Sequence, residues 1–210
     1  MRDGLAWLAR EDITWLGYCV TLARGVEPGE LVRRLSGDEP PEELGDRGAE
    51  ELVDFLDRRD RDRGRDDGVA VRYGTSAELS FAVAYGEWPG RLGPGYTDGL
   101  SGQDDHVFQL YYETQNPKRP PPEFSYFRDG GYVCGFQMYM HTWSHEITGP
   151  HPELLSDAVR AAGVPDEEDR GSAHARSLAV VEQVFGLTLP RDQVLHRAVP
   201  AALIRGQTPA

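Results

Sequence analysis

The apolar positions of this chain follow two periods, and the change between them separates predicted helices from predicted strands. Apolar residues three and four positions apart predict a helical segment over 4–16 and a helix over 27–36. Between them, 18–24 is an apolar and β-branched run, which is typical of a strand. From Val69 onward the period becomes two, and the strands that it predicts are 69–73, 79–85 and 106–113.

The densest apolar segment, 124–140, predicts a β-hairpin. Two aromatic-rich arms flank Arg-Asp-Gly-Gly at 128–131, whose Asp-Gly and Gly-Gly steps supply the positive φ angles that a tight turn needs. We expect the first part of the hairpin to lie in the sheet core. Cys134 belongs to that core, because it alternates with Tyr132 and Phe136 along one face.

The remaining apolar stripes predict further helices, over 48–59, 152–162, 172–185 and 190–199. Residues 38–46 are rich in proline and acids and predict a connector. Strands in consecutive hairpins, with helices in the N- and C-terminal parts, predict an α+β fold. We therefore expect a single domain over 1–204, built on a mostly antiparallel sheet of about five or six strands with the helices packed on it, and a loose C-terminal tail over 205–210.

Composition excludes some classes of partner. The chain has a formal net charge of -13 and 39% hydrophobic residues. Nucleic acids and anionic membranes bind positive surfaces, so we expect no binding to either. Arginine almost replaces lysine, Lys118 being the only lysine, which is a bias of GC-rich coding and not a sign of phosphate recognition. No apolar stretch reaches the ~20 residues of a membrane span and no leader pattern is present, which predicts a cytoplasmic location.

The two cysteines, Cys19 and Cys134, each lie in an apolar run. That position is typical of inert core thiols. A disulfide would need their Cα atoms within about 7 Å, and the sequence leaves open whether they are close.

One histidine cluster, His141 and His145 with Glu146, is the candidate for metal chemistry. On a helix, histidines four positions apart share a face and can chelate a transition metal. On an extended chain they lie about 13 Å apart, too far for one ion. Only a turn at 142–144 would bring them together. A metal-dependent hydrolase that uses these three residues is therefore the alternative interpretation.

Aromatic residues support the preferred interpretation, because those on an uncovered sheet face would form a binding surface. We expect that surface to combine the glycine-rich loop 86–102 with the hairpin and the segment after it. Its predicted binding residues are Trp88, Tyr96, His141, Trp143 and His145. We find no catalytic signature or cofactor motif, so the sequence predicts a non-enzymatic protein-interaction or ligand-binding domain without a cofactor, whose partner is another protein or a small ligand. Mimicry of nucleic acid is a third interpretation, and the scattering of the acids among arginines argues against it.

Six short motifs resemble those of one family. They are C-V-T-L-A-R-G at 19–25, E-P-G-E-L-V-R-R-L at 27–35, G-E-W-P-G at 86–90, F-S-Y-F-R-D-G at 124–130, G-P-H-P-E-L-L at 149–155 and S-L-A-V-V-E-Q-V-F-G-L-T-L at 177–189. In this order, and over nearly the whole chain, they resemble an uncharacterised actinobacterial domain family of unknown function. The resemblance implies one domain and no known activity. The chain departs from the family pattern at 140–148, where fewer histidines are expected, and we expect any activity special to this protein there.

Overall fold

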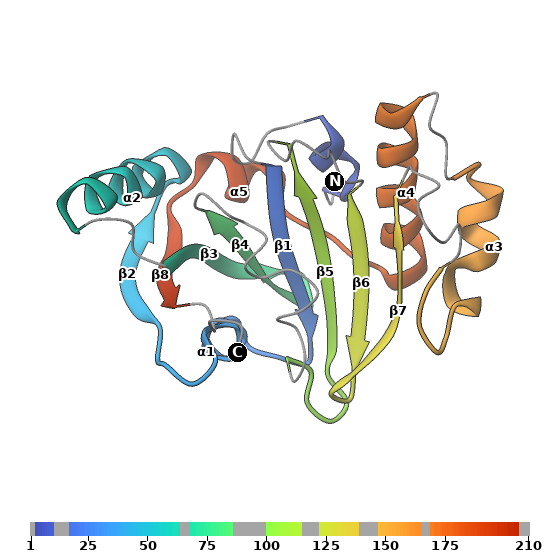
Figure 1. Cartoon of the computed structure of the whole chain (residues 1–210), viewed down its shortest axis with the longest axis horizontal. Helices are drawn as coiled ribbons and strands as arrows, with labels where there is room; N and C mark the ends of the chain where they lie inside the picture. The colour runs from blue at the N-terminus through green and yellow to red at the C-terminus, as the bar shows by residue number, and fades with distance from the viewer. Residues whose placement is uncertain are drawn as a thin grey trace.

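The computed structural model describes residues 3–10, 17–63, 68–85, 100–114, 122–138, 147–164 and 169–205. Within these ranges eight strands form one sheet, and every neighbouring pair of strands is antiparallel (Figure 1). The strands are β1 Gly17–Arg24, β2 Glu42–Arg47, β3 Gly68–Ser76, β4 Leu79–Tyr85, β5 His106–Glu113, β6 Glu123–Arg128, β7 Gly131–Gln137 and β8 Val199–Arg205. The predicted α+β class with an antiparallel sheet is confirmed, and the predicted five or six strands were too few.

Strand β1 occupies the middle of the sheet, whose order is β2-β8-β3-β4-β1-β5-β6-β7. It pairs with β4 on one side and with β5 on the other, so it joins the hairpin β3-β4 to the meander β5-β6-β7. Six of its eight residues, Tyr18 to Ala23, are apolar or uncharged and all are buried. A strand buried on both faces shows a continuous apolar run instead of alternation, as its sequence does.

One face of the sheet, which we call the first face, carries the larger of the two hydrophobic clusters. The helices are η1 Ala6–Ala9, α1 Pro28–Ser36, α2 Ala49–Arg63, α3 Glu153–Ala161, α4 Arg170–Phe185 and α5 Arg191–His196. Leu178 and Val181 of α4 belong to the same buried cluster as Phe108 and Phe124 of the sheet. The Phe185 ring stacks on Phe124 with 5.5 Å between ring centroids. Helix α2 lies beyond the β2 edge and α3 lies on the β7 side of the molecule (Figure 1).

The second face is covered by α1 where it passes over β3, β4 and β8. Pro28 occupies the first helical position, where its missing N–H costs nothing. Leu31, Val32 and Leu35 are buried against the sheet, as their spacing predicts.

Two strands contradict the sequence prediction. The segment 38–46, predicted to be a connector, contributes most of β2. The helix predicted over 190–199 ends at His196, and β8 begins three residues later. Because β8 lies between β2 and β3, the C-terminal end of the described chain is an internal strand of the sheet.

The predicted hairpin is confirmed, with one change in the direction of its side chains. Asp129 and Gly130 have φ angles of 51° and 77°, as the Asp-Gly turn requires. A bulge follows the turn, so that Tyr126 pairs with Cys134 while Phe127 pairs with Tyr132. Tyr132 therefore points away from Cys134 and packs on Phe127, and the prediction that it shares the face of Cys134 was wrong.

Two arginines of the sheet bind carbonyl groups in the C-terminal turns of helices. Arg72 is 1% exposed and donates to the Val194 carbonyl of α5 at 2.6 Å and to the Arg47 carbonyl of β2 at 3.0 Å. Arg24 donates to the Phe185 carbonyl at the end of α4 at 2.8 Å. Cations at this end of a helix stabilise its dipole, so both arginines tie a helix to the sheet.

None of the helices within the described ranges combines the length and the apolar content that crossing a bilayer requires.

Candidate functional site

The second face of the sheet becomes polar beside the part that α1 covers, over β1, β5, β6 and β7. Strand alternation points these side chains away from the first-face core. We call this set the polar floor. It consists of Cys19, Thr21, Gln109, Tyr111, Glu113, Glu123, Ser125, Gly135 and Gln137.

Strand register places most of the polar floor in two rows that run across the sheet. In the central row, Thr21 pairs with Gln109, Gln109 with Ser125, and Ser125 with Gly135. The second row consists of Cys19, Tyr111, Glu123 and Gln137, paired in the same way. Directly paired residues have Cβ atoms about 5 Å apart on one face, and rows two residues apart lie about 7 Å from each other. The rows therefore form one continuous polar surface.

Three oxygen atoms of the polar floor are buried and have no hydrogen-bond partner among the described residues. They are Thr21 Oγ1, Gln109 Oε1 and Gln137 Oε1. The Thr21 and Gln109 side chains are each 1% exposed. The contact recorded for the Gln109 amide is a weak one from Nε2 to Cys19 Sγ at 3.9 Å. Buried polar atoms are nearly always paired, so two such atoms on directly paired residues call for a functional explanation.

Two carboxylates give the polar floor an acidic side. Tyr111 donates its hydroxyl to Glu113 at 3.1 Å, and Gln137 donates its amide to Glu123 at 3.2 Å. The pKa of Tyr111 is raised, first by burial and then by the Glu113 carboxylate. Both causes disfavour a further negative charge on this part of the floor.

Burial also makes Cys19 unreactive. It raises the pKa of the Cys19 thiol to about 12, so the thiolate that would act as a nucleophile does not form near neutral pH. The described part of the chain contains no group of three His, Cys, Asp or Glu residues that could hold a metal ion. The polar floor therefore offers hydrogen-bonding groups and carboxylates, and its cysteine is protonated near neutral pH.

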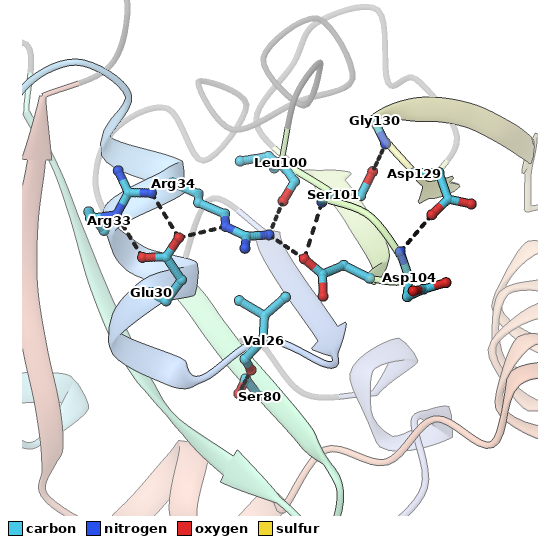
Figure 2. A network of polar contacts seen from close by, with 12 residues as sticks. Val26, Glu30, Arg33, Arg34, Ser80, Leu100, Ser101, Asp104, Asp129 and Gly130 are labelled. Carbon is cyan, nitrogen blue, oxygen red and sulfur yellow. Dashed lines mark hydrogen bonds and ion pairs between the residues drawn. The ribbon is translucent and has the colours of Figure 1, made fainter.

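The opposite end of the same face is apolar and filled. Leu100, Val107 and Phe127 belong to the cluster that α1 covers. Arg34 of α1 holds Leu100 in place by donating to its carbonyl at 3.0 Å and to Asp105 at 2.7 Å (Figure 2).

The hairpin tip is tied to the same turn. Gly130 N donates to Ser101 Oγ at 2.9 Å, and Asp104 N donates to Asp129 Oδ1 at 2.7 Å (Figure 2). These contacts join the hairpin tip to the 101–104 turn at the apolar end of the second face. The polar floor lies beyond this end, toward Gly17 and Glu113.

All the binding and metal residues predicted from the sequence lie outside the described residues. They are Trp88, Tyr96, His141, Trp143, His145 and Glu146. The segments that carry them leave the sheet after Tyr85 and Met138, at the end where Gly17 pairs with Glu113. That is the acidic end of the polar floor. Their roles in binding and in metal coordination stay predictions.

The structure shows that Cys19 and Cys134 do not form a disulfide. Both cysteines are free and buried. Cys19 belongs to the cluster on the second face and Cys134 to the cluster on the first face, so the sheet separates them.

Sequence reasoning missed the polar floor, although each strand carried a sign of it. Thr21, Gln109 and Ser125 are single polar residues in the middle of otherwise apolar strands. Only the pairing of β1 with β5 and of β5 with β6 reveals that the three form one row.

Two histidines outside the predicted cluster, His106 and His174, pair with tyrosines in the fold. His174 Nε2 lies 2.5 Å from the Tyr18 hydroxyl, and its ring meets the Tyr112 ring edge-on. His106 Nδ1 lies 2.7 Å from the Tyr126 hydroxyl and stacks on that ring. Both pairs lie on the first face, so neither contributes to the polar floor.

The fold is that of a small α+β domain with a buried polar face. Comparison of the sequence with family models identifies the family: residues 2–204 match a family of unknown function, DUF6461, and the chain belongs to it. The match confirms the membership of a family of unknown function that the motifs indicated. No curated protein and no solved structure shows significant similarity to the chain.

Proposed function

We propose that this protein is a binding domain for a small polar ligand, which it takes on the polar floor. The observation that carries the proposal is the pair of unpartnered oxygens on Thr21 and Gln109 in the described part of the chain. An unpaired buried polar group costs on the order of 1–3 kcal/mol, a cost that a ligand removes when it supplies the missing hydrogen bonds.

The dimensions of the floor favour a small molecule over a protein partner. From β1 to β7 the floor spans three strand spacings, about 14 Å, and its two rows are about 7 Å apart. Thr21 and Gln109 are 1% exposed, so a partner that reaches them has to be small enough to pass between the residues around them. A protein interface also needs roughly 800 Å² on each partner. The preferred interpretation from the sequence, interaction or ligand binding, thereby narrows to a small ligand.

The test compares the wild type with the double variant Thr21→Val, Gln109→Leu. Ligand-observed NMR with a panel of a few hundred small polar metabolites, each at millimolar concentration, reports binding to either protein. We expect some members to bind the wild type and to lose at least tenfold in affinity for the variant. A panel without a single binder, or binders that do not distinguish the two proteins, would overturn the proposal.

A further inference from the structure

We infer that the ligand of the polar floor is a small organic cation with ammonium or guanidinium groups, an inference that rests on the proposed function. It follows from which hydrogen-bonding groups and which charges the floor presents.

The floor presents acceptor oxygens that have no donor among the described residues. Gln109 Oε1 and Gln137 Oε1 are unpartnered among the described residues, and a carbonyl oxygen only accepts hydrogen bonds. The carboxylate of Glu123 also only accepts, and the donor recorded for it in the structure is the Gln137 amide. A ligand that completes these groups must bring several N–H or O–H donors.

The charge of the floor favours a positively charged ligand among those that carry several donors. Glu113 and Glu123 are acidic, and none of the nine residues that define the floor is basic. An anionic ligand, such as a phosphate or a carboxylate, would be repelled, whereas an ammonium or guanidinium group would be attracted to both carboxylates. The net charge of -13 acts in the same direction, because it raises the local concentration of cations near the molecule.

The arrangement of the acceptors indicates the length of the ligand. Glu123 lies one strand and one row away from Gln109. Strand geometry puts their Cα atoms about 8 Å apart. A chain of four carbons with a donor at each end can reach toward both acceptors at once, and a single ammonium ion cannot.

The experiment uses three probes that share a four-carbon chain: 1,4-diaminobutane, 1,4-butanediol and succinate. The side-chain amide signals of Gln109 and Gln137 in ¹⁵N-correlated NMR spectra report binding, each assigned through its Gln→Glu variant. We expect the diamine to shift both signals with at least tenfold higher affinity than the diol, and succinate to shift neither.

A matched pair of variants tests the role of charge. Glu123→Gln keeps the shape of the side chain and should lower the affinity for the diamine at least tenfold. Glu50→Gln removes the same charge on α2, far from the floor in the fold, and should leave the affinity unchanged.

The outcomes separate this inference from the proposed function. The inference of a cationic ligand would be wrong if the diol or succinate bound as well as the diamine. It would also be wrong if the diamine shifted neither amide signal. The proposed function fails only if the metabolite panel yields no binder that distinguishes the wild type from Thr21→Val, Gln109→Leu.

Discussion

At the scale of single residues, the buried hydroxyl groups of Thr21 and Ser80 differ in whether they have a hydrogen-bond partner. The two side chains are 1% and 4% exposed. Ser80 donates to the Val26 carbonyl at 2.5 Å (Figure 2), whereas Thr21 Oγ1 has no partner within the described ranges. One hydroxyl therefore stabilises the fold, and the other costs free energy in the ligand-free protein.

This difference predicts opposite effects on stability. Thr21→Val keeps the side-chain shape and removes the unpaired hydroxyl, so we expect it to stabilise the ligand-free protein by about 1 kcal/mol. Ser80→Ala should destabilise the protein by about 1–2 kcal/mol, because the Val26 carbonyl loses its donor. Thermal unfolding of the ligand-free proteins measures both, at about 2–4 °C per kcal/mol for a chain of this size. Loss of stability in Thr21→Val would show that the hydroxyl is already paired.

His174 predicts a pH dependence of stability. Burial lowers the pKa of His174 from 6.5 to about 4, so the folded protein holds the ring neutral. The stability that this contributes is fully present above pH 6.5 and is lost as the pH falls toward 4. Between pH 7 and pH 5 the loss is about 2 kcal/mol.

The comparison for this prediction is His174→Gln, which still offers an acceptor to the Tyr18 hydroxyl and does not titrate. Urea unfolding at the two pH values should show the loss in the wild type and a smaller loss in the variant. Equal losses in both proteins would assign the pH dependence to other groups.

At the scale of elements, six of the strands and most helices were predictable because burial imposes a period on their sequences. Strand β2 shows no such period, since Glu42–Arg47 lies at the sheet edge and its side chains are exposed or half-buried. The sequence did not predict strand β8 because it contains Pro200, and proline is disfavoured inside a sheet. Pro200 pairs with Asp46 of β2, and the pairing of β8 with β3 starts only at Ala201. The proline thus avoids the positions where both neighbours need hydrogen bonds.

The internal position of β8 predicts a sharp boundary for truncation. A chain that ends at Ala198 loses Ala201 and Leu203 from the first core and Ala202 and Ile204 from the second. Burial of the two larger side chains alone contributes roughly 3–6 kcal/mol, a large part of the ~5–15 kcal/mol that hold a domain folded. We expect this chain to show no cooperative transition by circular dichroism.

The control chain ends at Arg205 and removes only 206–210, the part that the sequence predicts to be a loose tail. It should unfold at the wild-type temperature. Cooperative unfolding of the chain that ends at Ala198 would mean that β8 does not hold the sheet together.

At the scale of the whole molecule, the placement of β1 creates the candidate site. An N-terminal strand inserted between β4 and β5 brings Thr21 beside Gln109, 88 positions away in the sequence. Helix α1 follows β1 closely and covers the part of the second face that β3, β4 and β8 form. The polar floor beside it carries acceptors and carboxylates in a protein of net charge -13, which is why a cationic ligand is the partner that we propose.

The sequence alone determined the fold class, the hairpin, the core helices and the family, because each depends on a local pattern or on the order of motifs. The count of strands and the direction of Tyr132 depend on edge pairing and on a bulge, and local patterns do not contain either. The polar floor depends on the register of three strand pairs, which hydrogen bonding between distant segments sets. Only the tertiary structure could therefore show that three isolated polar residues form one surface.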